Sequence, residues 1–152
     1  MIFVTGATGM VGANLIALFD RNNVEYKALK RKSSTLNIVK NVFKIYGIES
    51  KIQNIKWVEG DVTDYPSLLQ AMENCDKVVH AAGLVSFNKF DKKRLEEVNI
   101  FGTENIVNAS LALKIEKLIY ISSIATLGNS NSNLITEDDF YDFGINKSYY
   151  AE

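Results

Sequence analysis

Residues 2–12 read IFVTGATGMVG, a short apolar run followed by a loop that carries three glycines. Ile2–Val4 predicts a buried strand, and apolar residues at helical spacing predict a helix that begins at about Gly9. Gly6 permits a tight turn out of the strand, Gly9 lets a phosphate approach backbone N–H groups, and Gly12 lets the helix pack close to the sheet. Such glycines could merely turn the chain, but their place between a strand and a helix predicts a phosphate-binding loop.

The rest of the chain alternates short apolar runs with amphipathic stretches. Further strands are expected at about 24–29, 55–58, 77–80 and 118–121, and helices at about 9–20, 36–46, 64–72 and 91–113. A side chain within 33–35 is expected to cap the second helix, and Asp64 the third. This alternation predicts an α/β fold with a doubly wound parallel sheet of strand order 3-2-1-4-5. Its ligand crevice is expected where the order reverses, between the first and fourth strands.

Composition narrows the class of protein. The 152 residues are 47% hydrophobic, which suits one domain with its own core. Seventeen basic and 18 acidic residues give a net charge of −1, so neither nucleic acid nor a membrane surface is expected as a partner. No apolar run reaches the roughly 20 residues that span a bilayer. The first residues do not resemble a signal peptide, and the lone Cys75 fits a reducing compartment, so a cytoplasmic protein is expected. A single histidine, His80, excludes a histidine-rich metal site.

The end of the second strand bears on the choice of cofactor. An NAD site usually places an acidic residue about 20 positions after the glycines, where it binds the ribose 2′-hydroxyl. Residues 30–33 instead read KRKS, and no carboxylate lies between Glu25 and Glu49. Cations there suit a 2′-phosphate, which Arg31 can bind with two parallel hydrogen bonds and Lys32 can support. The sequence therefore favours NADP over NAD, although an ordinary solvated basic turn would look the same.

Five segments resemble motifs of the extended branch of the short-chain dehydrogenase/reductase superfamily. They are TGATGMVG at 5–12, GDVTD at 60–64, HAAG at 80–83, VNIFGTEN at 98–105 and ISSIATLG at 121–128. The branch includes nucleotide-sugar epimerases and dehydratases, dihydroflavonol-type reductases and hydroxysteroid dehydrogenases. The resemblance covers nearly the whole chain and implies a Rossmann-like NAD(P)-binding domain over residues 1–152.

The resemblance also implies which residues contact the cofactor. Asp61 follows the third strand, where its carboxylate can accept a hydrogen bond from the adenine amino group; it could instead cap a helix or turn, but Asp64 suits that role better. His80 ends a buried strand and is expected to be structural rather than catalytic. The remaining expected contacts with NADP, or with NAD as the alternative, are Gly6, Thr8, Gly9, Met10, Val11, Gly12, Arg31, Lys32, Val62, Ala81, Ala82, Gly83 and Ser122.

The catalytic residues implied by the resemblance are Ser123, Tyr150 and Asn99. Ser123 stands five positions before Gly128, as the family's catalytic hydroxyl does, and is preferred to its neighbour for that reason. Asn99 would help to hold structure and water beside the active site, although it could also be a satisfied buried amide. Tyr150 would be the tyrosine of the Y-x-x-x-K motif, with the preceding tyrosine as the alternative.

The motif's lysine would fall two residues after Glu152. A nearby cation stabilises the phenolate and so lowers a tyrosine pKa from its usual value near 10. We therefore expect the chain to be the N-terminal portion of a larger enzyme, ending before the last strands and the substrate region, and to show little turnover alone. In the full-length protein, the helix over 91–113 is a candidate for pairing two copies.

Three functions fit these observations. The first is an NADP(H)-dependent oxidoreductase acting on a carbonyl or alcohol of a small-molecule substrate, and the apolar side chains around Val85 and Phe87 mildly favour a substrate other than a sugar. The second is a nucleotide-sugar epimerase or dehydratase with tightly bound NAD. The third is a module that binds NAD(P) without catalysis.

Overall fold

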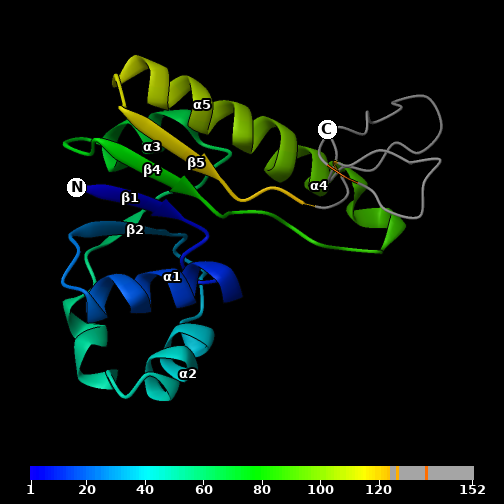
Figure 1. The fold of residues 1–152 in the computed structure, drawn as a ribbon. Coiled ribbons are helices and arrows are strands. Elements are labelled where there is room, and N and C mark those ends of the chain that lie inside the picture. The colour runs from blue at the N-terminus through cyan, green and yellow to red at the C-terminus, as the bar shows by residue number, and fades with distance from the viewer. Residues whose placement is uncertain (124–125, 127–135, 137–152) are drawn as a thin grey trace.

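A five-stranded parallel sheet forms the centre of the protein (Figure 1). The computed structural model describes residues 1–123, 126 and 136. The strand order is β3-β2-β1-β4-β5, which confirms the predicted order and the doubly wound α/β class. The strands are β1 (Ile2–Thr5), β2 (Tyr26–Lys30), β3 (Trp57–Glu59), β4 (Lys77–His80) and β5 (Lys117–Tyr120).

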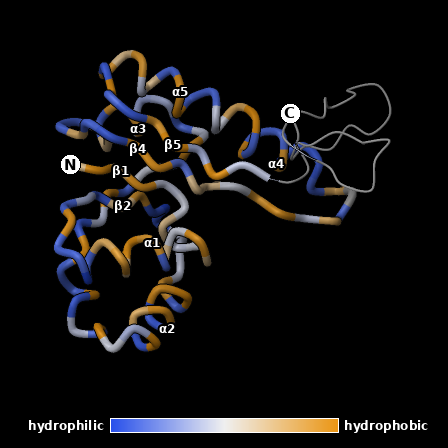
Figure 2. Tube along the Cα trace, viewed as in Figure 1, coloured by the Kyte–Doolittle hydropathy of each residue, from blue (hydrophilic) through white to orange (hydrophobic). Residues whose placement is uncertain are grey.

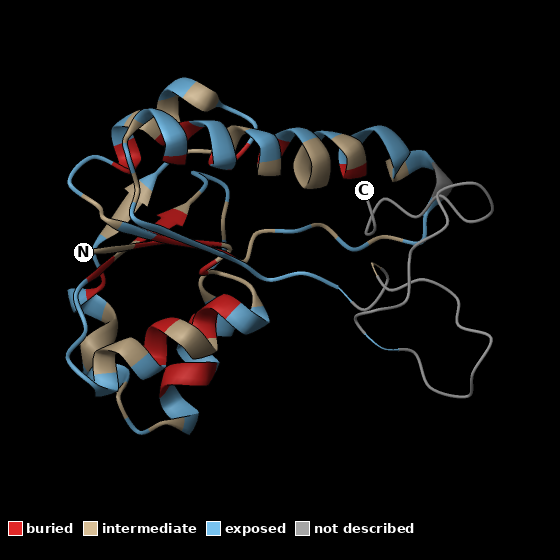
Figure 3. Cartoon of the chain, turned by 45° about the horizontal axis from the view of Figure 1, so that its top comes forward, coloured by how far each residue is buried: buried red, intermediate tan, exposed pale blue. Residues whose placement is uncertain are grey.

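Helices cover both faces of this sheet. On one face lie α1 (Met10–Arg21) and α2 (Asn37–Ile45), and on the other lie α3 (Tyr65–Ala71) and α5 (Gly102–Ala112) (Figure 1). Successive side chains of β1 serve the two layers, because side chains of a strand alternate between its faces. Val4 belongs to the core under α1 and α2, and Phe3 to the core under α3 and α5. Both are fully buried, as Figure 3 shows for the centre of the sheet.

The last strand differs from the others. Apolar runs buried on both faces were expected for all strands, but every residue of β5 is exposed. Strand β5 lies at the edge of the sheet, where only β4 pairs with it. Figure 2 colours the tube of β5 by hydropathy, and Ile119 is 45% exposed.

The helix expected over 91–113 is interrupted. It consists of a 3₁₀ turn η2 (Lys89–Asp91), α4 (Lys92–Glu96), a π-helical turn η3 (Glu97–Phe101) and then α5. A π turn inserts one residue into the helical repeat and so rotates the next turns of the helix about its axis. Here it brings Gly102 against Val62 in the loop after β3, so close that a methyl group on the glycine would lie 2.8 Å from the valine side chain.

The expected helix caps are partly wrong. Helix α2 begins only at Asn37 and has no side-chain cap, because Ser34 Oγ accepts a hydrogen bond from the Arg31 N–H at 3.1 Å instead. Asp64 stands at the start of α3 but makes no capping hydrogen bond. A second 3₁₀ helix, η1 (Glu49–Asn54), was not predicted. Every helix in the described part of the chain is too short or too polar to cross a membrane.

Candidate functional site

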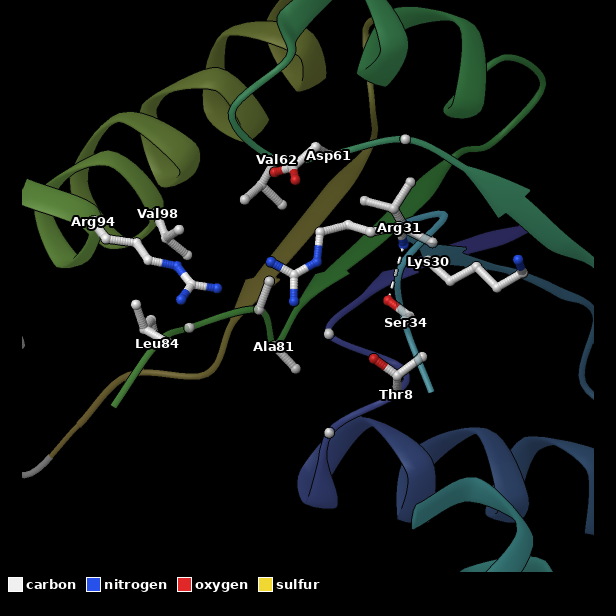
Figure 4. Close-up of a pocket in the computed structure, with 16 residues that line it drawn as sticks. Thr8, Lys30, Arg31, Ser34, Asp61, Val62, Ala81, Leu84, Arg94 and Val98 are labelled. Carbon is white, nitrogen blue, oxygen red and sulfur yellow. Dashed lines mark hydrogen bonds between the residues drawn. The ribbon is translucent and has the colours of Figure 1, made fainter. Parts of the chain in front are cut away.

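A cavity of about 230 Å³ opens at the carboxyl ends of the strands, where the sheet order reverses. Segments far apart in the sequence converge on it: the loop after β1, the ends of β2, β3 and β4, and the helix α4 with its π turn (Figure 4). Its lining residues are Gly6, Thr8, Gly9, Leu29, Lys30, Arg31, Ser34, Gly60, Asp61, Val62, Ala81, Ala82, Gly83, Leu84, Arg94 and Val98. A crevice at this place is the usual ligand site of a doubly wound sheet.

The glycine loop forms one wall of the cavity. Gly6 has a φ of +67°, and a side chain there would overlap the backbone of Ala81. A side chain on Gly12 would likewise overlap the Gly6 carbonyl, so only glycine lets α1 begin so near β1. The first turn of α1 has no side-chain cap and no acidic residue. Its N–H groups can therefore receive an anionic ligand.

His80 joins the strands beneath this wall to the helix above it. Its Nδ1 lies 2.7 Å from Thr5 Oγ1, and its Nε2 lies 3.0 Å from Thr103 Oγ1. The Thr103 hydroxyl donates to the Asn99 carbonyl at 2.7 Å, so it accepts from Nε2–H, and Nδ1 accepts from the Thr5 hydroxyl. Thr5 Oγ1 in turn accepts from the Ala82 N–H at 3.2 Å. These residues form a chain of hydrogen bonds with a single direction, which we call the His80 relay.

The relay requires a neutral imidazole. Burial lowers the pKa of His80 to about 4, because the charged form would lose its hydration. The side chain is 1% exposed. His80 therefore has the structural place expected of it, and its two hydrogen bonds fix the end of β4.

Asn99 extends the same scaffold to the next loop residue. Its Oδ1 accepts from the Leu84 N–H at 2.8 Å, and its Nδ2 donates to the Leu84 carbonyl at 3.0 Å. The Asn99 amide thus forms two hydrogen bonds with the backbone of Leu84, as a residue on a neighbouring strand would. Together with the relay it holds the segment 81–84, which forms one side of the cavity.

The chain is also similar to known proteins. Residues 2–152 match the model of the NAD dependent epimerase/dehydratase family. The chain belongs to this family. The match confirms the resemblance to short-chain dehydrogenases and reductases seen in the five motifs.

Individual members of the family give the same result. A putative dihydroflavonol 4-reductase from Synechocystis is 35% identical over 126 residues, which are 83% of this chain and 33% of that protein. A 3 beta-hydroxysteroid dehydrogenase/Delta 5-->4-isomerase from monkeypox virus is 28% identical over 133 residues, 86% of this chain and 36% of that protein. The chain thus spans about a third of the length of these relatives.

Among solved structures, a short-chain dehydrogenase/reductase superfamily protein from Agrobacterium tumefaciens with bound NAD has the same fold. It superposes with a TM-score of 0.78 at 21% identity, covering 99% of this chain and 40% of that one.

Most of the cofactor contacts expected from the sequence line the cavity described above. Those that do are Gly6, Thr8, Gly9, Arg31, Asp61, Val62, Ala81, Ala82 and Gly83. Met10 and Val11 lie exposed in the first turn of α1 outside the cavity lining, and Gly12 is buried behind the loop. Lys32 lines a neighbouring surface hollow that it shares with Arg31 and Asp61.

Among the described residues, the structure does not bring the expected catalytic residues together in the cavity. Ser122 and Ser123 come after β5 and are exposed, and neither lines the cavity. Asn99 binds the backbone of Leu84. Tyr150 and the alternative Tyr149 lie outside the described residues.

Asp61 makes the turn-capping contacts that the sequence assigned to Asp64. Its Oδ1 accepts hydrogen bonds from both the N–H and the hydroxyl of Thr63, each at 3.0 Å. It therefore caps the turn before α3. The carboxylate still lines the cavity, where it can meet a ligand.

Sequence reasoning missed several lining residues: Leu29, Lys30, Ser34, Gly60, Leu84, Arg94 and Val98. The spacing of Arg94 and Val98, four residues apart on one helix, was a signal that they share a face. Nothing in their local sequence indicated that this face turns to the cavity, because the π turn sets its rotation.

Proposed function

We propose that this chain forms the cofactor-binding part of an NADP(H)-dependent oxidoreductase that acts on a carbonyl or alcohol of a small organic molecule. The observation that carries the proposal is Arg31, which stands at the end of β2 and directs its guanidinium into the cavity (Figure 4). No carboxylate comes after β2 that could bind the ribose 2′-hydroxyl of NAD. A ribose 2′-phosphate would find a planar cation in its place.

The local structure supports this role for Arg31. Its backbone N–H is bound by Ser34 Oγ, so the turn after β2 has a defined shape. Lys30 also lines the cavity and Lys32 the neighbouring hollow, which adds positive charge around the same point. The similarity to a putative dihydroflavonol 4-reductase favours a reductase over the other members of the family.

Each part of the chain would have its own task in this reaction. NADP(H), when bound, supplies the hydride. The glycine loop and Arg31 bind it, the relay and Asn99 hold the wall beside it, and Ser123 orients the reacting oxygen of the substrate. Tyr150 would donate or accept the proton.

Titration with NADPH and NADH tests the proposal. We expect tighter binding of NADPH, and we expect Arg31→Gln to weaken NADPH binding about tenfold to a hundredfold while NADH binding stays unchanged, since a charge-assisted hydrogen bond is lost. Lys56→Gln is the matched control, because it removes one exposed positive charge away from the cavity.

Equal affinity for the two nucleotides would contradict the proposal. A tightly held NAD that co-purifies with the protein would favour the epimerase or dehydratase alternative. Binding of NADPH without hydride transfer to any carbonyl, in a protein that includes the motif's lysine, would favour the non-catalytic alternative.

A further inference from the structure

A second arginine faces the cavity from the opposite side. Arg94 lies on α4, while Arg31 comes directly after β2, and Figure 4 shows both side chains directed into the same space from opposite walls. Thr8 and Gly9, at the start of α1, line the cavity together with them. The glycine loop and Arg94 can therefore contact one ligand at the same time.

Among the described residues, no carboxylate pairs with either guanidinium, because none lies within ion-pair distance of Arg31 or Arg94. Glu97, on the same helix, pairs with Lys93 at 3.8 Å, and Asp61, which lines the cavity, is held by Thr63. Two like charges that face one cavity repel each other unless an anion lies between them. The arrangement therefore fits a ligand with negative charge at two places.

The helix that carries Arg94 is well anchored. Leu95 is buried beneath it, and the π turn after it is tied to the Leu84 backbone through Asn99. Arg94 and Val98 share the cavity face, while Asn99 and Thr103 bind the loop and the relay. Inserted π turns occur frequently at functional sites. Around this turn, one helix contacts the cavity with one face and binds the loop and the relay with another.

We propose that Arg94 binds the diphosphate of the dinucleotide from the side opposite the glycine loop. The assignment rests on the proposed function, which gives the 2′-phosphate to Arg31. A diphosphate lies at the N-terminus of the helix after the first strand, here α1, whose first turn has N–H groups without a side-chain cap. A guanidinium can bind two phosphate oxygens at once, and Arg94 is the cation that α4 presents to this cavity.

Three variants of the two arginines separate the two phosphate sites. The affinity of NADPH and of NADH is measured by isothermal titration for the unaltered chain, Arg94→Gln, Arg94→Lys and Arg31→Gln. Because both nucleotides carry the diphosphate, we expect Arg94→Gln to weaken both by the same factor, about tenfold to a hundredfold. Arg94→Lys keeps the charge but loses the planar pair of donors, so we expect an intermediate loss. Arg31→Gln should weaken NADPH alone.

Lys93→Gln is the matched control. It removes one positive charge at the adjacent position, but Lys93 is paired with Glu97 and does not line the cavity. We expect its affinities to equal those of the unaltered chain. An equal loss in this variant would mean that general charge, not contact, is responsible, and would overturn the assignment.

The remaining outcomes are also decisive. If Arg94→Gln weakens NADPH alone, Arg94 reads the 2′-phosphate, and the diphosphate assignment is wrong. If it weakens neither nucleotide while the unaltered chain binds both, only the role of Arg94 falls. If the unaltered chain binds neither nucleotide, the proposed function and this assignment fall together. An unchanged melting temperature of Arg94→Gln shows that the exposed substitution leaves the fold intact.

Discussion

His80 is a base kept neutral by the protein interior. Its pKa falls to about 4 in the folded protein, whereas an exposed histidine has a pKa near 6.5. At a pH between these two pKa values, His80 is protonated in the unfolded chain but not in the folded chain. The free energy of unfolding is therefore not reduced by His80 above about pH 6.5. It declines as the pH falls toward 4, with a loss on the order of 3 kcal/mol from this group.

We expect urea unfolding of the unaltered chain to show this decline, and His80→Gln to lack it. The difference between the two curves isolates the histidine, since the carboxylates titrate in both proteins. Asp76 has a pKa lowered by its hydrogen bond to the N-terminal ammonium, so its contribution disappears only at lower pH. His80 is the sole histidine, so nuclear magnetic resonance can follow its ring directly. A ring pKa near 6.5 in the folded protein would contradict the buried relay.

Sequence reasoning reached the single residues unevenly. The glycine loop, Arg31 and the small residues after β4 were predictable, because each occupies a fixed offset from a strand end. Arg94 was not, because its role depends on how a helix is rotated in three dimensions. The capping contacts of Asp61 were equally hidden, since aspartate suits a turn at position 61 or 64.

At the scale of the element, the π turn is the feature that the sequence did not reveal. The apolar spacing from Leu95 to Leu113 is compatible with a continuous helix, so periodicity predicted one. The inserted residue appears in the structure as the π turn η3, just before Gly102. Strands and their order were predictable because short apolar runs and right-handed crossovers leave few arrangements.

We expect Gly102→Ala to destabilise the protein by about 1–3 kcal/mol, although alanine normally stabilises a helix relative to glycine. The added methyl group would lie 2.8 Å from Val62 Cγ2, and Val62 is buried. Chemical unfolding measures the change. Because Val62 lines the cavity, nucleotide affinity should also fall.

The double variant Gly102→Ala with Val62→Ala provides the control. Removing the valine methyl groups relieves the overlap, so we expect the two substitutions to be less harmful together than their sum. Simple additivity would show that the close contact is not the cause.

At the scale of the whole molecule, the cavity joins both halves of the sheet. Its walls come from β1, β2 and β3 on one side and from β4 and α4 on the other. A ligand bound there contacts segments from both halves of the sheet, which are also linked by the pairing of β1 with β4. Occupancy should therefore stabilise the domain as a unit, and not one loop alone.

We expect NADPH at about 100 times its dissociation constant to stabilise the chain by about 2.7 kcal/mol. For a domain of this size that corresponds to a rise in melting temperature of roughly 5–10 °C. Calorimetry measures the rise. Arg31→Gln at the same NADPH concentration should show a smaller one, and an equal rise in both proteins would indicate that the nucleotide binds elsewhere.

The His80 relay also limits which substitutions related proteins can carry. Each of its three side chains, Thr5, His80 and Thr103, accepts a hydrogen bond from one neighbour and donates one to the next. Replacing either threonine hydroxyl therefore leaves the groups on both sides of it without that partner. Such a substitution lowers the free energy of unfolding by more than the loss of one side chain's own contacts. Thr5, His80 and Thr103 lie far apart in the sequence, yet we expect related proteins to retain or replace the three together.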